Sequence, residues 1–496
     1  MFSTAATVRV ATAQFYSHTD VSANLQLCVD YMRQAKEVGA KLIVLPENAN
    51  RCRDFKTREA AWETCEDLDG EFVRGLQAAS KELGIIVVAG VDIRGKTKPD
   101  CIIAQVIVED GKLIYTHEKT VLWDYEYTLF VPGSKELQVV PTSIGDVLAC
   151  AGETDAGMVY ADITPKTSFP KYLNGGVGSL SEFRRPDLYQ ELLKPLDTHA
   201  GASMFGPIAE DTPRKPLRAA TLQLSWYHST KWTVTRTLGQ ITYAASRGAQ
   251  LAVFPELWCF RRGEVAADPK AAADFSADLL EQIKQTVATA KRLIYVVANL
   301  VECDSDDDSK FYSTAYLINS EGAISARYRK AHLGETERSW ATAGQEGLVV
   351  VDTPIGRVGL MIGNEVWLPE VTRILTLRGA EVIAHPADWD RVEAATMAAV
   401  ERTEENRTHL VSCARTDNPA RFGSQVVVAD RFRPGQCIAL MRYPTAIWSR
   451  TGFEENIFYE LDLMDSHSKM MGFNLDPVAT MQPTLYRVLA EADGFA

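Results

Sequence analysis

Two stretches of the chain repeat the same order of hydrophobic and polar positions. In each, a short apolar segment precedes a longer one with helical periodicity, and a second apolar segment then ends in Pro-Glu. The segments lie at 9–15, about 20–38 and 41–48 in the first stretch, and at 218–224, about 229–247 and 250–257 in the second. These patterns predict a strand, an amphipathic helix and a second strand in each stretch.

Strand-rich segments follow in both stretches, at 84–118 and 292–330. The second stretch then continues into a longer alternation of strand and helix patterns. Its strands are expected at 357–362, 380–384 and 409–414, and its helices near 367–378 and 390–407. Strands that alternate with helices and then pair in hairpins predict a layered α/β sandwich.

Matching positions in the two stretches lie at a nearly constant separation, which indicates a tandem repeat. The separation is 209 residues for Gln14–Gln223 and Glu47–Glu256, and 211 residues for Lys119–Lys330 and Glu126–Glu337. It is still 211 where VVPTSIG at 139–145 matches VVDTPIG at 350–356.

The separation then increases sharply, to 300 residues for Asp162–Asp462 and 297 for Tyr189–Tyr486. An internal deletion of about 86–89 residues in the first copy explains the jump. The alternative is that GDVLACAGE at 145–153 is still the strand before the reactive residue, and that the tail match is chance.

The segment 195–216 is rich in Pro, Gly and small polar residues, which is typical of a linker. We therefore expect a truncated domain over residues 1–194 and a complete one over residues 217–496.

Composition narrows the functional classes. The net charge of −13 argues against a general binder of nucleic acid or anionic membranes. No run of about 18 apolar residues occurs, and the N-terminus lacks the pattern of a signal peptide. The nine cysteines form no CxxC pair, so we expect reduced thiols in a cytoplasmic protein. No zinc spacing, phosphate loop or dinucleotide fingerprint is present, and we expect neither metal nor cofactor.

Charged residues at the ends of two predicted strands suggest chemistry. Attack on an amide or nitrile carbon requires a nucleophile, a base, an acid for the leaving amine and a charge that stabilises the oxyanion. Glu256 follows an apolar strand and can act as the base, because partial burial raises a carboxyl pKa. Lys330 ends another strand and can stabilise the oxyanion, with Glu337 in support.

Three motifs together resemble the carbon–nitrogen hydrolase (nitrilase/amidase) superfamily: Q-x-x…PE, YRKAHLGETE…W-x-T-x-G, and TPIGRVGLMIGNEVWLPE. The resemblance implies an αββα sandwich, present here as one truncated and one complete copy. It also implies cofactor-free hydrolysis of a small amide or nitrile, and assembly as a homo-oligomer or an intramolecular pseudo-dimer. The catalytic glutamate, lysine and second glutamate of the family map onto Glu256, Lys330 and Glu337.

The sequence departs from the family at the nucleophile. The family's cysteine falls at Gly363, which has no side chain, so no thioester can form in this chain. Either the glycine is an engineered change that inactivates a complete site, or it is native. Rescue by Cys259 is not expected, because a thiol that follows an apolar strand is typically a buried structural one.

The first copy retains Glu47, Lys119 and Glu126 but offers no thiol in the nucleophile position. Under the deletion hypothesis the nucleophile strand is missing and Cys150 is an ordinary strand residue. Under the ungapped alternative Gly152 occupies the position. In both cases we expect no catalysis there, and a structural role beside the second copy.

Further residues near predicted strand ends are candidates for the substrate pocket. The set comprises Trp367, His385, Asp388 and Trp389, with Arg415 and Asn418 after a later strand. The leading hypothesis is thus an amide or nitrile hydrolase whose second domain holds the site. The rival is a natural non-hydrolytic member, which binds an amide-like ligand or a partner, or uses the Glu–Lys–Glu set for acid–base chemistry such as dehydration or cyclisation.

Overall fold

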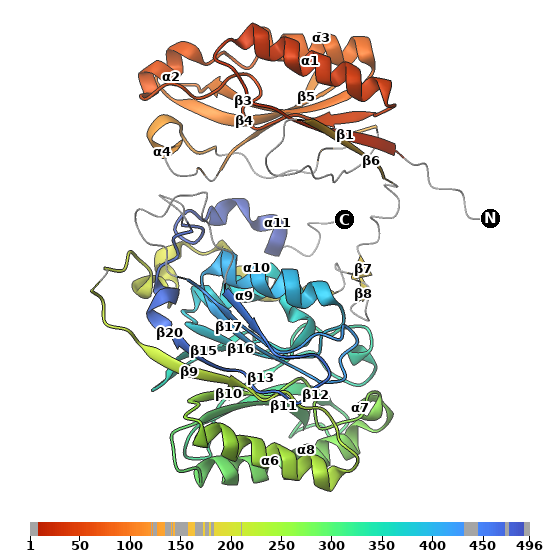
Figure 1. Cartoon of the computed structure of the whole chain (residues 1–496), viewed down its shortest axis with the longest axis vertical. Coiled ribbons are helices and arrows are strands. Elements are labelled where there is room, and N and C mark those ends of the chain that lie inside the picture. The colour runs from red at the N-terminus through yellow and green to blue at the C-terminus, as the bar shows by residue number, and fades with distance from the viewer. Residues whose placement is uncertain are drawn as a thin grey trace, which may run out of the picture. The chain divides into compact units, whose positions relative to one another are not determined.

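The structure is a computed structural model. It describes residues 8–120, 122, 126–133, 140, 142–143, 157–163, 172–173, 178–179, 183–209, 211–430, 445–471 and 476–490. By internal contacts the chain divides into two compact units. Unit 1 comprises residues 1–170 with 473–475, and unit 2 comprises residues 171–472 with 476–496. Each unit is described by itself (Figure 1).

Unit 1 contains one six-stranded sheet with the order β5-β4-β3-β2-β1-β6. Its strands are β1 (Val8–Gln14), β2 (Leu42–Val44), β3 (Ile86–Arg94), β4 (Cys101–Glu109), β5 (Lys112–Glu118) and β6 (Gly157–Ile163). Its helices are α1 (Val21–Glu37), α2 (Arg58–Thr64), α3 (Glu71–Leu83) and α4 (Glu126–Leu129).

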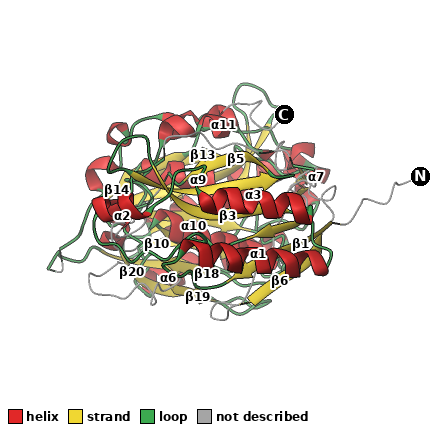
Figure 2. Cartoon of the chain, turned by 90° about the horizontal axis from the view of Figure 1, so that it is seen from above, coloured by secondary structure: helices red, strands yellow, loops and turns green. Residues whose placement is uncertain are grey.

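The helices α1 and α3 run side by side over one face of this sheet (Figure 2). Helix α1 begins where the Asp20 carboxylate accepts hydrogen bonds from the first free backbone N–H groups, and α3 ends at Gly84 in the left-handed conformation. Their apolar faces, with Met32 and Leu76 fully buried, form a core with the strands. The helix expected at 20–38 is confirmed. Helix α3 was not predicted.

Unit 2 contains two six-stranded sheets. The first has the order β13-β12-β11-β10-β9-β20, from β9 (Pro216–Thr221), β10 (Leu251–Val253), β11 (Tyr295–Cys303), β12 (Phe311–Ile318), β13 (Ile324–Arg329) and β20 (Phe458–Asp462). The second has the order β14-β15-β16-β17-β18-β19, from β14 (Val349–Thr353), β15 (Gly356–Leu360), β16 (Val382–Ala387), β17 (His409–Ala414), β18 (Gln425–Val428) and β19 (Thr445–Trp448). A small hairpin of β7 (Tyr172–Leu173) and β8 (Gly178–Ser179) lies outside both sheets.

Helices cover both outer faces of unit 2. On the first sheet lie α6 (Thr230–Ser246) and α8 (Pro269–Ala288), and on the second lie α9 (Pro369–Leu377) and α10 (Ala399–Asn406) (Figure 1). The short helices α7 (Glu264–Ala267) and α11 (Arg487–Ala490) complete the unit. The largest apolar core fills the space between the two sheets. The predicted αββα sandwich is therefore confirmed.

The strand pairing supports the tandem repeat, including the match of Asp162 with Asp462 after the jump in separation. In unit 1, β6 pairs antiparallel with β1 at the edge of the sheet, as β20 pairs antiparallel with β9 in unit 2. Tyr160 lies opposite Ala11, and Phe458 lies opposite Ala220. Tyr160 and Phe458, which occupy the same register position in the two units, are 298 residues apart in the sequence. The sequence match gave a separation of 300.

The deletion removes the counterpart of the second sheet. From Lys119 to Tyr160 the chain has 41 residues, whereas from Lys330 to Phe458 it has 128. In unit 2 that interval holds β14 to β19 with α9 and α10. The first copy is therefore a half-sandwich. Cys150 and Gly152, on which the ungapped alternative rests, lie outside the described residues.

The segment 183–193, expected at the end of the first domain, groups with unit 2. Tyr189 and Leu192 are buried in the largest apolar cluster of unit 2, and the segment contacts α9 and α11. The segment also shares a local motif with the C-terminal tail, because the Tyr189 hydroxyl accepts a hydrogen bond from Arg185 N as the Tyr486 hydroxyl does from Gln482 N. The boundaries at 194 and 217 stay a prediction.

The other face of the unit 1 sheet matches the inter-sheet face of unit 2. Val10, Leu42 and Ile86 form a small apolar cluster on it. Their counterparts at a separation of 209 are Ala219, Leu251 and Tyr295, which belong to the core between the two sheets of unit 2. Unit 1 thus retains the apolar surface that a second sheet would cover.

We expect residues 1–195, expressed alone, to give an aggregated or poorly folded product, because a half-sandwich has no second sheet of its own to cover that apolar face. Light scattering and thermal unfolding measure this. Val44→Thr with Ile107→Thr, on that face, should raise the soluble yield. Val87→Thr, on the helix-covered face, should not. A soluble, cooperatively melting monomer from the unmodified fragment would contradict the half-sandwich interpretation.

Candidate active site

Strand ends in unit 2 bring the three predicted charged residues together. Glu256 follows β10, and its backbone N–H donates to the carbonyl of Ala387 on the second sheet at 3.2 Å. Lys330 follows β13, and Glu337 opens a 3-10 turn seven residues later. The site therefore depends on both sheets.

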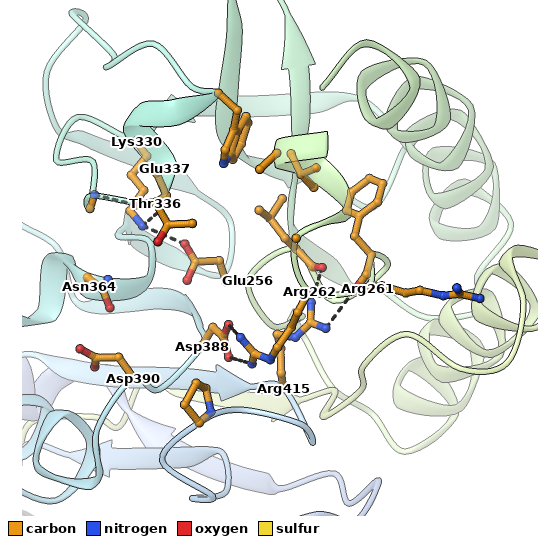
Figure 3. A pocket seen from close by; sticks show the side chains of 18 residues that line it. Glu256, Arg261, Arg262, Lys330, Thr336, Glu337, Asn364, Asp388, Asp390 and Arg415 are labelled. Atoms are coloured by element: carbon orange, nitrogen blue, oxygen red, sulfur yellow. Dashed lines mark hydrogen bonds and ion pairs between the residues drawn. The ribbon is translucent and has the colours of Figure 1, made fainter. Parts of the chain in front are cut away.

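The Lys330 ammonium lies between the two carboxylates (Figure 3). Its Nζ is 2.8 Å from Glu256 Oε1 and 2.7 Å from Glu337 Oε1. The other oxygen of Glu337 accepts a hydrogen bond from Gly334 N at 2.9 Å, which fixes the carboxylate. The Lys330 side chain is 1% exposed and that of Glu256 is 10% exposed, so water screens these charges little.

Burial and pairing determine how the set titrates. Burial raises the pKa of Glu256 above the ordinary range, and the positive charge of Lys330 only partly offsets this effect. Burial alone would lower the pKa of Lys330, but the two carboxylates outweigh it and raise that pKa. Glu256 can therefore hold and release a proton while Lys330 stays charged, as a general acid–base group requires.

Gly363 lies against this set, at the turn after β15. Its φ of +53° is in the left-handed region, where a side chain is strained, as it is at nucleophile positions between a strand and a helix. A Cβ atom built on Gly363 would lie 2.2 Å from Glu256 Oε2. Glycine leaves the space of a side chain free at this position. The Glu256 carboxylate fills it.

A buried hydrogen-bond network supports the turn that contains Gly363. Both Glu365 oxygens take part: one accepts from Ile362 N at 2.9 Å, and the other accepts from the Tyr328 hydroxyl and His332 Nδ1. Burial opposes the charge on Glu365, but the hydrogen bonds from His332 and Tyr328 and the nearby positive charges together outweigh it and lower the pKa. The ring of His332 continues to the Tyr189 hydroxyl at 3.0 Å. This network was not predicted.

His385 supports the same turn. Burial lowers its pKa to about 4, so the ring is neutral at neutral pH. Its Nε2–H donates to the Gly363 carbonyl at 2.9 Å, and Nδ1 accepts from the Ser412 hydroxyl. Trp389 packs edge-on against this ring, and its indole donates to Gly423 O. Both side chains are buried behind the turn.

A cavity of about 310 Å³ opens above Glu256 and Lys330. Its apolar wall includes Leu257, Phe260, Val265, Trp340 and Pro419, and its polar lining includes Glu337, Asn364, Asp388, Asp390, Arg261, Arg262 and Arg415. The expected pocket residue Asp388 lines it, whereas His385, Trp389 and Trp367 do not. Their expected role in substrate binding stays a prediction.

Two arginines of the lining are already engaged. Arg262 forms a bidentate pair with Asp388, at 2.7 and 2.9 Å. Arg415 pairs with Asp417 and donates to the carbonyls of Leu257 and Phe260. The other candidate from that loop, Asn418, bonds backbone carbonyls instead of lining the cavity. Cys259 is buried in the apolar core, as expected.

Unit 1 preserves the charge set in a different environment. Lys119 Nζ is 2.7 Å from Glu47 Oε1 and 2.9 Å from Glu126 Oε2. The Glu47 side chain, however, is 51% exposed. Arg53, which matches Arg262 of unit 2, bonds Glu126 and Asp92 instead of a residue from a second sheet. The set has become a local ion network.

Among the described residues, no group of three or more His, Cys, Asp or Glu side chains is arranged to hold a metal ion. None of the helices in the described part of the chain combines the length and apolarity needed to cross a bilayer.

The layered sheets and the strand-end charges define an αββα-sandwich protein. The family described as carbon-nitrogen hydrolase matches the chain twice, over residues 9–176 and 218–415. The chain therefore belongs to the carbon-nitrogen hydrolase family, and the two matches agree with the tandem repeat.

Individual relatives match at moderate identity. A nitrilase of Pyrococcus abyssi is 33% identical over 182 residues, which cover 35% of this chain and 65% of the relative. The chloroplastic omega-amidase of Arabidopsis thaliana is 25% identical over 243 residues, covering 43% and 61%. The chain thus spans less than two thirds of the length of each of these relatives.

Solved structures of the same kind also align. A carbon-nitrogen hydrolase from Helicobacter pylori G27 aligns with a TM-score of 0.39 and 22% identity, over 51% of this chain and 91% of that one. An amidase from Nesterenkonia sp. aligns with a TM-score of 0.42 and 21% identity, over 53% and 94%.

Replacement of Glu256 tests the burial of the charge set. The raised pKa means that the folded protein retains a proton that the unfolded chain releases. The stability that Glu256 contributes through its raised pKa is fully present below the ordinary glutamate pKa of 4.5. This contribution is lost as the pH rises through the raised pKa. Each tenfold change in the acid constant is worth about 1.4 kcal/mol.

Glu256→Gln imitates the protonated form, so its Tm should equal that of the parent near pH 4.5 and exceed it increasingly towards about pH 9. Calorimetric melting across this range measures the difference. Glu47→Gln is the matched control, because Glu47 is half exposed and its ion pair is screened. Parallel Tm profiles for Glu256→Gln and the parent would contradict a buried, destabilised carboxylate.

Proposed function

We propose that unit 2 carries an amide- or nitrile-binding site of the carbon–nitrogen hydrolase type, which lacks its nucleophile in this chain. The observation that supports this most is the buried Lys330 ammonium, held by Glu256 and Glu337 on the floor of a cavity beside Gly363. A fixed positive charge in a poorly screened site is suited to stabilise an oxyanion.

The geometry assigns a role to each group when a thiol is present at position 363. The thiolate attacks the substrate carbon, and Lys330 stabilises the oxyanion that forms. Glu256 gives a proton to the leaving amine, and the C–N bond breaks. Glu256 then takes a proton from water, which cleaves the thioester, releases the acid and regenerates the thiolate. Glu337 keeps the Lys330 ammonium in place.

With glycine at position 363 this covalent route is closed, but the means to bind an amide remain. The cavity and the Glu256–Lys330–Glu337 set are present, so the chain is expected to bind small amides without hydrolysing them at an ordinary enzymatic rate. A water molecule cannot replace the thiol, since it is a weaker nucleophile and forms no covalent intermediate.

A second candidate is an acid–base reaction such as dehydration or cyclisation, in a natural member that never uses a cysteine. The position of the Glu256 carboxylate favours it, because this group fills the space of the missing side chain and burial raises its pKa. The codon at position 363 of the natural gene separates the two candidates. A cysteine codon supports the hydrolase and a glycine codon supports the acid–base enzyme.

Gly363→Cys should restore the hydrolase. The Glu256 carboxylate must first rotate away from the new Cβ, which the end of a flexible side chain can do. The nearby Lys330 ammonium should favour the thiolate, so the introduced thiol should react with iodoacetamide faster than the native cysteines. Mass spectrometry should find an acyl adduct at residue 363, and ammonia should be released from a panel of amides and nitriles.

Three controls separate the thiol from its surroundings. Gly363→Ala adds the Cβ without sulfur and should gain neither reactivity nor turnover. In the Gly363→Cys protein, Glu256→Gln should abolish ammonia release, whereas Glu47→Gln should leave it nearly unchanged. If the Gly363 protein itself turns over a substrate at an ordinary rate without an adduct, the hydrolase proposal is wrong and the acid–base candidate replaces it.

A further inference from the structure

The cavity of unit 2 is lined by four basic side chains, Lys330, Arg261, Arg262 and Arg415, and by four acidic ones, Glu256, Glu337, Asp388 and Asp390. Lys330 is one cation between the two carboxylates of Glu256 and Glu337. Arg262 forms a bidentate ion pair with Asp388. Three of the four acidic side chains are therefore paired with a cation of the lining.

Asp390 is the fourth acidic side chain of this lining, and it forms no ion pair within the described part of the chain. Its Oδ1 accepts a hydrogen bond from Arg391 N at 2.9 Å. Its Oδ2 is buried and has no hydrogen-bond partner among the described residues. The Arg391 guanidinium, which is adjacent in sequence, bonds Glu393 instead.

The groups around Asp390 compensate its negative charge only in part. Burial raises its pKa to about 6, although a nearby indole, that of Trp367, favours the charged form. Neither the Trp367 Nε1–H nor Asp390 Oδ2 completes a hydrogen bond within the described part of the chain. A cation bound in the cavity beside this carboxylate would offset its negative charge.

The position of Asp390 relates it to the proposed reaction site. Asp390 and Asn364 lie on the same side of the cavity (Figure 3). Asn364 directly follows Gly363 in the turn after β15. A small amide seated beside Gly363 can therefore extend its other end along the wall that carries Asp390.

We infer that the ligand of this cavity is a small aliphatic amide that carries a protonated amino group, and that Asp390 binds this ammonium. The inference rests on the proposed amide-binding function and adds the substrate class. An ammonium supplies the hydrogen-bond donors and the positive charge that Asp390 lacks. A ligand with a free carboxylate at this end would meet the like charge of Asp390 and bind more weakly.

Titration calorimetry on the full Gly363 chain at about pH 7.5 tests this, with three amides of similar size. The probes are γ-aminobutyramide, which is cationic at this pH, neutral valeramide and anionic succinamate. We expect γ-aminobutyramide to bind about tenfold or more tightly than valeramide, the effect of one charge-assisted hydrogen bond, and succinamate to bind weakest.

Asp390→Asn should abolish this preference and leave valeramide binding unchanged, which also shows that the variant is folded. Its side-chain oxygen can still accept from Arg391 N. Asp417→Asn is the control, because it removes an equal charge that pairs with Arg415 and does not line the cavity. It should retain the preference.

Other outcomes overturn the inference in distinguishable ways. Equal affinity for γ-aminobutyramide and valeramide, or tighter binding of succinamate, refutes the ammonium while amide binding stands. A preference for γ-aminobutyramide that survives in Asp390→Asn refutes the role of Asp390. If no amide binds to the parent protein, the proposed function fails and this inference fails with it.

Discussion

The Lys330 ammonium, enclosed by two carboxylates where the sheets of unit 2 meet, is the interaction on which the site depends. A buried charge costs several kcal/mol unless close partners compensate it, and here Glu256 and Glu337 lie within 2.8 Å. The strands β10 and β13 deliver Glu256 and Lys330, while the second sheet covers them and contributes the Gly363 turn. In unit 1, where the matching residues lack such a cover, Glu47 is half exposed to water.

The second sheet therefore separates a reactive site from an ion network of the same composition. In unit 2 it brings Asp388 to Arg262 and closes a cavity over the lysine. In unit 1 the matching Arg53 turns inward to Glu126 and Asp92. The loss of one sheet changes the burial, the partners and hence the chemistry that the same residue types can support.

Patterns within the sequence predicted the elements and the charge set but not the contacts between sheets. The repeat located Glu256, Lys330 and Glu337 because their spacing recurs in both copies. The helices α3 and α8 were missed, although their apolar faces pack on the sheets. The bonds from Glu365 to His332 and Tyr328, and the orphaned Asp390 oxygen, depend on which strand ends meet in space, and no local pattern records that.

The role of Gly363 also depended on the structure. The sequence indicated a missing side chain, whereas the fold places the Glu256 carboxylate in its space. The most direct test of the account is the crystal structure of the unmodified chain with a simple amide bound. The amide oxygen should accept a hydrogen bond from Lys330 Nζ, with the amide carbon over Gly363. An amide that binds elsewhere, with Lys330 still closed between Glu256 and Glu337, would contradict the account.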